Sequence, residues 1–136
     1  MYDKERIGKI VSDLERFFSD LEEIHIKSVN DFEDKKNFYS ISMLLFSIIN
    51  RTIDLGEEIV TANNLGTPST YKDIFFLLMK SKIINRQMQK ELSELTSYRN
   101  LFSYEYYAFT EKDVFTALIK VNIVKDFVKQ VKRKVK

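Results

Sequence analysis

The sequence ISMLLFSIINRTIDLGEEIV, residues 41–60, decides the fold. Its apolar residues recur at helical spacing and form two stripes instead of one. The first stripe comprises Ile41, Leu45, Ile48, Leu55 and Ile59, and the second comprises Phe46, Ile49, Ile53 and Val60. So wide an apolar surface predicts a long helix, ending near Asn64, that packs against two neighbours. One neighbour is the chain's own bundle, and we expect the other to be a second subunit, because two-fold dimers are the commonest soluble oligomers.

Helical spacing also dominates the rest of the chain. Amphipathic helices are predicted over residues 3–28, over residues 71–80, from Asn85 onward and from Thr110 to the end. No segment alternates polar and apolar residues as a half-buried strand would, and no linker divides the chain. The sequence therefore predicts an all-α fold: one domain over residues 1–136, an antiparallel bundle of about five helices that forms a dimer.

Residues 63–70, NNLGTPST, are the clearest break between helices. Gly66 is expected at the left-handed position that ends the long helix, and Pro68 prevents the helix from continuing. Thr70 and Asp73 then have the spacing of a capping box at the start of the next helix.

Composition excludes several classes of protein. The 136 residues contain no cysteine, so disulfides, thiolate metal sites and a cysteine nucleophile are excluded. His25 is the single histidine and is expected to face solvent at the end of the first helix. No apolar run approaches the roughly 20 residues of a membrane span. We expect a cytoplasmic protein with no cofactor, no metal ion and no membrane contact.

The stretch YRNLFSYEYY, residues 98–107, carries the candidate site. Arg99 continues a helical stripe of core-like residues, namely Met88, Leu92, Leu95, Phe102 and Tyr106. A guanidinium on an apolar stripe loses hydration and must find an anion or a polar cavity. The alternative is a purely structural role, in which the tyrosines pack in the core or at an interface and Arg99 pairs with Asp54 or a glutamate.

Two other charged features have simple structural explanations. On the long helix, Arg51 and Asp54 lie in a polar seam between the apolar stripes. An ion pair between these two side chains within the helix is slightly favoured over a role in supporting a functional site. The last twelve residues carry six bases against Asp126 alone. A basic tail can attract polyanions, but a solvated helix end is favoured.

Residues 98–107 resemble the signature of HEPN domains of the HepT type, in which Arg-Asn begins an Arg-x-x-x-x-His-x-Tyr pattern. Three further segments are similar to the same family: FYSISMLLF (38–46), NNLGTP (63–68) and YKDIF (71–75). This resemblance implies a homodimeric helical bundle that acts as a metal-independent endoribonuclease toxin on RNA, such as tRNA or mRNA. It also implies a minimal nucleotidyltransferase antitoxin that silences the toxin by adenylylation. Carried onto this chain, the catalytic residues are Arg99, Asn100 and Tyr104, and the modified residue is Tyr106.

Tyr104 departs from the family pattern, because it stands where the family has histidine. A tyrosine titrates near 10, so only about one in a thousand is ionised at pH 7, and it is a poor resting base. The alternative function is therefore a weakened or inactive HEPN protein that binds RNA, nucleotide or a nucleotidyltransferase partner. In one unbroken helix Arg99 and Tyr104 also point roughly 140° apart. Either the helix breaks after Phe102, or two copies of the motif meet in a dimer cleft.

Overall fold

The computed structural model describes residues 1–104 and 108–136, and the regular structure in these ranges is entirely helical. The helices are α1 (Lys4–Ile24), the 3-10 helix η1 (Val29–Glu33), α2 (Lys35–Ala62), α3 (Tyr71–Lys80), α4 (Arg86–Thr96), α5 (Tyr98–Tyr104), α6 (Glu111–Lys120) and α7 (Ile123–Val135). The predicted all-α bundle is confirmed. In the described ranges, no helix is apolar over a stretch long enough to cross a membrane.

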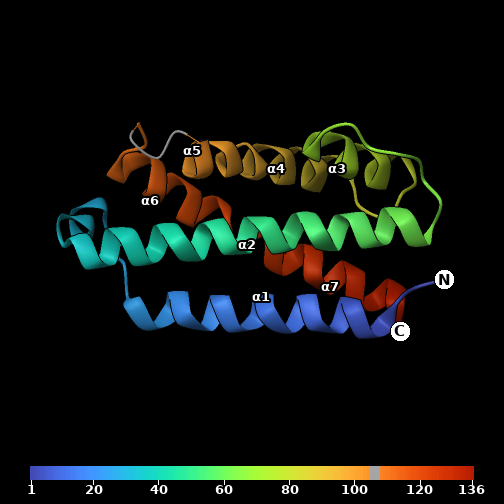
Figure 1. Cartoon of the computed structure of the whole chain (residues 1–136), viewed down its shortest axis with the longest axis horizontal. Helices are drawn as coiled ribbons and strands as arrows, with labels where there is room; N and C mark the ends of the chain where they lie inside the picture. Colours follow the sequence, from blue (N-terminus) through green and yellow to red (C-terminus); the bar gives the residue numbers. More distant parts are fainter. Residues whose placement is uncertain (105–107) are drawn as a thin grey trace.

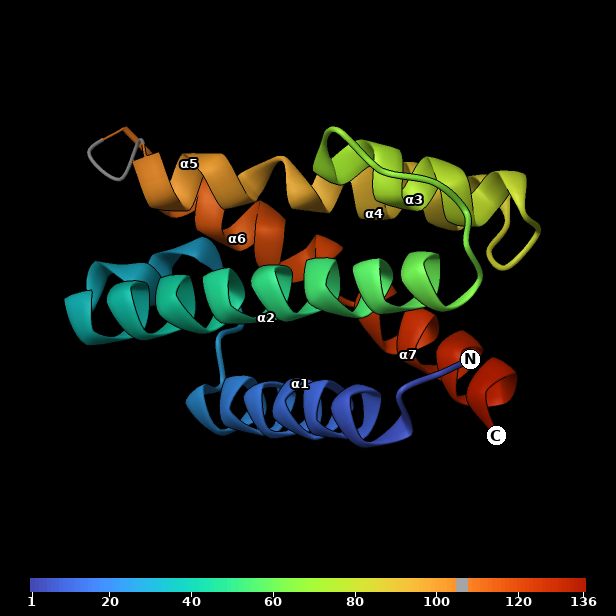
Figure 2. The ribbon, with the colours of Figure 1, turned by 45° about the vertical axis from the view of Figure 1, so that its right-hand side comes forward.

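Helix α2 is the axis of the bundle (Figure 1). It runs antiparallel to α1 on one side, while α3, α4 and α5 line its other side and α6 and α7 cross behind it (Figure 2). Both predicted stripes of α2 are used within the single chain. Every member except Phe46 is buried, including Ile49, Ile53 and Val60 of the second stripe. The second stripe is therefore covered within the chain except at Phe46, with α1, α3, α5 and α6 among the helices that contact α2, and a contact of α2 with a second subunit stays a prediction.

Capping residues start the helices where the sequence predicts. Thr70 accepts a hydrogen bond from the Asp73 backbone at 3.2 Å, Thr110 does the same for Asp113 at 3.2 Å, and Asn85 accepts from Met88 at 2.8 Å. These caps fix the first residues of α3, α6 and α4.

The ends of two helices differ from the prediction. Asn64, with φ 51°, takes the left-handed position after α2 that was expected of Gly66, whose φ is 131°. Asparagine tolerates this conformation because its short polar side chain can hydrogen-bond locally. Helix α1 ends at Ile24, before Ser28, because exposed His25 turns left-handed with φ 54°.

Two of the five predicted helical segments are each divided by a short break. Ser97 separates α4 from α5, and residues 121–122 separate α6 from α7. Side chains at both breaks bond to backbone carbonyls: Thr96 donates to Ser93 at 3.0 Å, and Asn122 donates to Ile119 at 3.2 Å. Such bonds compete with the regular helical pattern. The first break sets the direction of α5, the helix that carries Arg99.

Candidate functional site at Arg99

Arg99 lies in the first turn of α5 and reaches α2. Its Nε donates a hydrogen bond of 3.2 Å to the side-chain oxygen of Asn50, 49 residues earlier in the chain. The Arg99 side chain is half-buried, so the fold removes part of its hydration and replaces it with this contact. Asn50 therefore fixes the guanidinium at the surface of α2.

Two aromatic rings also lie close to the Arg99 guanidinium. The guanidinium carbon lies 5.9 Å from the centre of the Phe46 ring on α2 and 5.4 Å from that of Tyr71 on α3. Both distances are within the range of cation–π attraction. Together, Phe46, Asn50 and Tyr71 form what we call the Arg99 cradle.

The cradle residues were not identified as site residues from the sequence. One signal was present, because Phe46 and Asn50 are four residues apart and so share one face of α2. Both side chains are half-buried and face α5.

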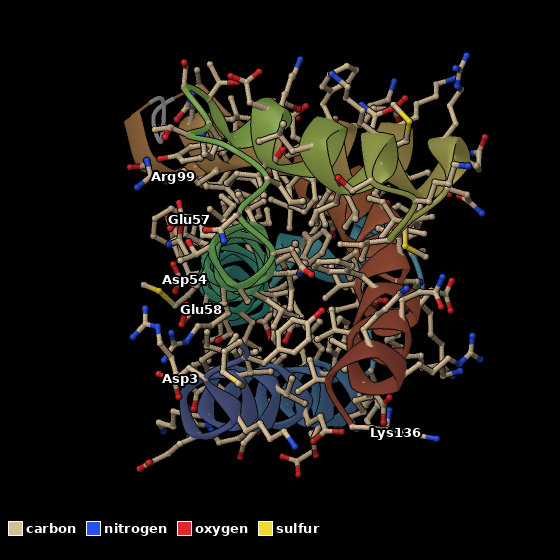
Figure 3. The ribbon with its side chains drawn as sticks, turned by 90° about the vertical axis from the view of Figure 1, so that its right-hand side faces the viewer. Asp3, Asp54, Glu57, Glu58, Arg99 and Lys136 are labelled. Carbon is tan, nitrogen blue, oxygen red and sulfur yellow. The ribbon has the colours of Figure 1, made fainter. Side chains whose placement is uncertain are left out.

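The surface beside the cradle is apolar and open. On α2, Tyr39 is 64% exposed and Met43 is 65% exposed. They precede Phe46 by seven and three residues, so the three side chains form a continuous strip that leads to Arg99. Figure 3 shows Arg99 on the same side of the molecule as Asp54, Glu57 and Glu58 of α2.

The other predicted site residues are distributed along and beyond α5. Asn100 is exposed, and it follows Arg99 by about 100° around the helix. Helix α5 continues through Phe102 to Tyr104, so the helix break expected after Phe102 is absent. The side chain of Tyr104 lies outside the part of the chain that the structure describes. Tyr106 lies outside the described residues.

The polar seam at Arg51 and Asp54 holds α1 against α2. Arg51 contacts Asp54 at 3.1 Å, as the sequence predicts, but it also contacts Asp13 of α1 at 2.7 Å. Lys9 is a further partner of Asp13, at 3.0 Å. Hydrogen bonds from Lys9 and Arg51 hold the pKa of Asp13 below its ordinary value. This buried carboxylate was not predicted, and its contacts give the Arg51 seam a structural function.

Glu57 is a titratable group on the same side of α2 as the cradle. Partial removal from water raises the pKa of Glu57 above its ordinary value, and the negative charges of Asp54 and Glu58 add to this. Seven residues separate Glu57 from Asn50, which corresponds to about 10 Å along a helix. Proton transfer needs hydrogen-bond contact, so Glu57 is too far along α2 to serve a phosphate bound beside Asn50.

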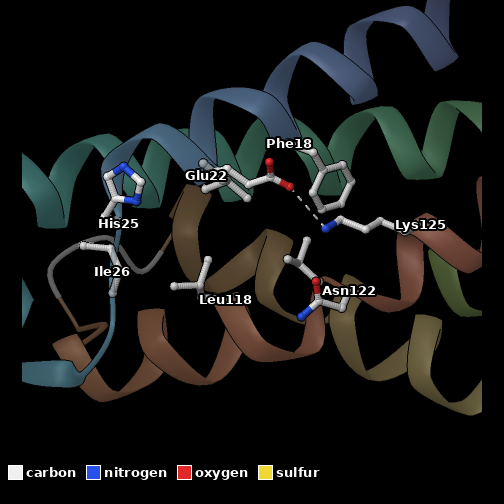
Figure 4. Close-up of a pocket in the computed structure, with 9 residues that line it drawn as sticks. Phe18, Glu22, His25, Ile26, Leu118, Asn122 and Lys125 are labelled. Carbon is white, nitrogen blue, oxygen red and sulfur yellow. Dashed lines mark ion pairs between the residues drawn. The ribbon is translucent and has the colours of Figure 1, made fainter.

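His25 belongs to a different part of the surface. It lines a groove of about 470 Å³ together with Phe18, Glu22, Leu118 and Lys125 (Figure 4). None of the cradle residues lines this groove. Within the described ranges, no group of three or more His, Asp or Glu side chains has an arrangement that could hold a metal ion.

Sequence comparison identifies the family. The profile of the HepT-like ribonucleases matches residues 7–132, nearly the whole chain. The chain belongs to the HepT-like ribonuclease family. None of the curated proteins compared with this HepT-like chain matches it.

Solved structures share the HepT-like fold. A HEPN toxin from Shewanella oneidensis, described as tri-AMPylated and in complex with an MNT antitoxin, has a TM-score of 0.85 and 19% identity. The match covers 98% of this chain and 99% of that one. YutE, a cytosolic protein of unknown function from Bacillus subtilis, also has a TM-score of 0.85 and 19% identity, covering 99% and 93% of the two chains. A toxin–antitoxin structure with AMP-PNP has a TM-score of 0.84 and 17% identity over 93% and 97%. At these identities the likeness concerns the fold.

Proposed function

We propose that this HepT-like protein is a metal-independent endoribonuclease toxin in which Arg99 binds the phosphate that is cleaved. The observation that carries the proposal is the Arg99 cradle, in which Asn50, Phe46 and Tyr71 hold a half-buried guanidinium. Family membership supplies the reaction class. An arginine fork matches phosphate oxygens, and a fixed cation stabilises the charge that develops on a phosphorane.

The proposed step is attack of a ribose 2′-oxygen on the adjacent phosphorus. A base takes the 2′-hydroxyl proton, the bond from phosphorus to the 5′-oxygen breaks, and an acid protonates that oxygen. The products are a 2′,3′-cyclic phosphate and a 5′-hydroxyl, with no other reactant. Arg99 neutralises the phosphate oxygens, Asn100 donates a hydrogen bond, and Tyr104 donates or accepts the proton.

Two copies of the chain are proposed to complete the site. Since residues five apart on an ideal helix lie roughly 140° apart, a phosphate between two protomers would receive Arg99 from one and Tyr104 from the other. The apolar strip of Tyr39, Met43 and Phe46 beside Arg99 supports a contact with a second copy at this face.

The proposed partner is a minimal nucleotidyltransferase antitoxin. The Tyr106 oxygen would attack the α-phosphorus of ATP held by that enzyme, pyrophosphate would leave, and AMP would remain on the tyrosine. Tyr106 lies seven residues after Arg99, so a bulky anion there competes with RNA for the same cation. The solved neighbours that contain a toxin with its antitoxin support this proposal.

A second candidate function follows from Tyr104. A protein that lacks the motif histidine binds RNA, nucleotide or the nucleotidyltransferase through Arg99 but turns over slowly or not at all. Replacing Tyr104→His restores a group that titrates near neutrality and should raise cleavage by roughly 10²–10⁴-fold. An unchanged rate in the folded variant would count against the view that the missing histidine limits activity.

The nuclease proposal is tested with purified protein, tRNA and mRNA in a buffer that contains EDTA. The wild-type chain should produce fragments that end in a 2′,3′-cyclic phosphate, and Arg99→Ala should lower the rate by about 10²–10³-fold. Arg133→Ala is the matched control, because Arg133 is an exposed arginine of α7 that bonds to Gln130. Equal rates for wild type and Arg99→Ala would contradict the proposal.

The antitoxin proposal is tested by intact-mass analysis after co-expression with a minimal nucleotidyltransferase antitoxin. The wild-type chain should gain AMP, and Tyr106→Phe should gain less or none. Tyr107→Phe is the matched control. AMP on the Tyr106→Phe variant at the wild-type level would show that another residue is the acceptor.

A further inference from the structure

A second surface near Arg99 is strongly basic. The outward side of α4 and its neighbours α3 and α6 enclose an open groove of about 620 Å³. Four cations line it, namely Lys72, Arg86, Lys90 and Lys120, and Glu94 is the one carboxylate in the lining. We refer to this surface as the α4 groove. Arg86 and Ser97 mark its two ends on α4 and lie about 16 Å apart along the helix.

Glu94 is the one carboxylate in the lining that compensates the positive charge of the α4 groove, and Lys90 interacts with it electrostatically. Lys120 pairs with Glu94 at 3.0 Å. Lys72, Arg86 and Lys90 form no ion pair within the part of the chain that the structure describes. The lining therefore keeps a net charge of about +3, and such a groove attracts a polyanion over several ångströms.

The basic C-terminal helix is the competing surface, and its charge is better compensated. Lys132 of α7 contacts Glu15 at 3.0 Å, and Lys125 contacts Glu22 at 3.6 Å. Both partners belong to the acidic side of α1. The interpretation of this tail as a solvated helix end fits these contacts, whereas the α4 groove gathers four cations around one opening, so the α4 groove is the stronger candidate for a polyanion.

The α4 groove begins where the Arg99 cradle ends. On α3, the Tyr71 ring lies beneath the guanidinium at 5.4 Å, and the next residue, Lys72, lines the groove. On α5, Tyr98 lines the groove and precedes Arg99. Helices α3 and α5 thus each contribute one residue near Arg99 and a neighbouring residue to the α4 groove. An RNA strand that extends from Arg99 over the start of α3 would reach this groove.

We propose that the α4 groove binds the phosphate backbone of single-stranded RNA that flanks the phosphate held by Arg99. This inference rests on the proposed function and adds a binding site that lies outside the Arg99 cradle. Lysine and arginine side chains along a groove bind the phosphates of a single nucleic-acid strand, and these contacts do not depend on the base sequence. The polar side chains of Gln89, Ser93 and Ser97 in the lining provide further hydrogen bonds to phosphate and ribose.

The test compares two double variants that remove the same charge. Lys72→Gln with Lys90→Gln neutralises the groove, and Lys129→Gln with Lys134→Gln neutralises two exposed lysines of α7. The probe is a fluorescein-labelled oligouridine with 2′-O-methyl riboses, which cannot be cleaved through the 2′-oxygen, and binding is followed by fluorescence anisotropy over a range of salt concentrations. Loss of two phosphate contacts should make the slope of log K against log salt about 1.4 less steep and weaken binding about 25-fold near 0.1 M salt. The α7 variant should retain the wild-type slope.

The outcomes separate this inference from the proposed function. Because the probe is inert, weaker binding and a shallower slope for the groove variant support the α4 groove whether or not natural RNA is cleaved. Cleavage that depends on Arg99, together with an unchanged slope for the groove variant, would overturn the groove and leave the nuclease standing. Loss of the nucleotidyltransferase complex with unchanged RNA binding would also overturn it, since the groove would then bind the protein partner.

Discussion

Asn50→Ala tests whether the cradle positions Arg99. The variant removes the oxygen that accepts the 3.2 Å hydrogen bond from Arg99 Nε and leaves both aromatic rings in place. A hydrogen bond to a charged group contributes about 1.5–3 kcal/mol. Because Asn50 and Arg99 are both half-buried, we take the lower end, about 1.5 kcal/mol, which corresponds to roughly a tenfold change in rate. We therefore expect kcat/KM for RNA to fall about tenfold, with a melting temperature lowered by no more than several degrees because the same hydrogen bond also contributes to stability.

Asn50→Asp sharpens this test. A carboxylate at position 50 would bind Arg99 more strongly than the amide does, but it would neutralise the cation that is proposed to receive the phosphate. RNA cleavage should then fall further than in Asn50→Ala, although the contact between α2 and α5 becomes stronger. Asn30→Ala, at an exposed asparagine of η1, is the matched control. Wild-type rates for both Asn50 variants in folded protein would refute the positioning role of Asn50.

Three further predictions concern the fold and the cradle. Gly56→Ala should destabilise the fold by up to about 2 kcal/mol in thermal unfolding, because an added Cβ would lie 2.6 Å from Ile74 Cγ2. Gly8→Ala is the control: an added Cβ there has nothing within 4 Å, so the variant should stabilise the fold by up to about 1 kcal/mol. A stabilising Gly56→Ala would contradict the close packing of α2 on α3. The pKa of Asp13 is lowered in the fold, so its contribution to stability is complete above its ordinary pKa of 3.8 and is lost as the pH falls through the lower folded value. Asp13→Asn should accordingly lower the melting temperature at pH 7 and lose less stability than the wild type on acidification, and parallel pH profiles for the two proteins would refute this. Tyr71→Phe should retain RNA cleavage, because the aromatic ring is sufficient for the cation–π contact with Arg99. Tyr71→Leu, which lacks the ring, should lower kcat/KM for RNA by roughly 2- to 30-fold. Equal rates for the two variants would show that the Tyr71 ring does not contribute to cleavage.

Much of the fold was predictable because local signals and tertiary packing agree. The capping residues Thr70, Asn85 and Thr110 begin the helices that the sequence indicates. The two apolar stripes of the 41–60 stretch correctly predicted the long helix α2, which is buried along both stripes. The stripe pattern could not say which neighbour covers it, because a second subunit and the chain's own helices bury the same residues.

The breaks in the helices were harder to predict. A helical period continues across Ser97, and the side-chain bonds that compete there depend on the rotamers of neighbouring hydroxyl groups. Asn64 and Gly66 could each supply the left-handed position after α2, and glycine was preferred on propensity alone.

The candidate site was only half visible in the sequence. Arg99 stood out because a cation interrupts an apolar stripe, and the family motif includes it. Its partners Phe46, Asn50 and Tyr71 come from helices 28 to 53 residues away, and periodicity carries no information about such distant contacts. The same holds for Asp13, whose contact with Arg51 spans 38 residues.

The most direct measurement of the central claim is kcat/KM on one RNA that the wild-type protein cleaves, for the wild type and for Arg99→Ala, in EDTA. If Arg99 is the cation that stabilises the transition state, the variant should be about 10²–10³-fold slower, Arg133→Ala should be unchanged, and the melting temperatures of all three proteins should agree closely. Cleavage by folded Arg99→Ala at the wild-type rate would contradict the account.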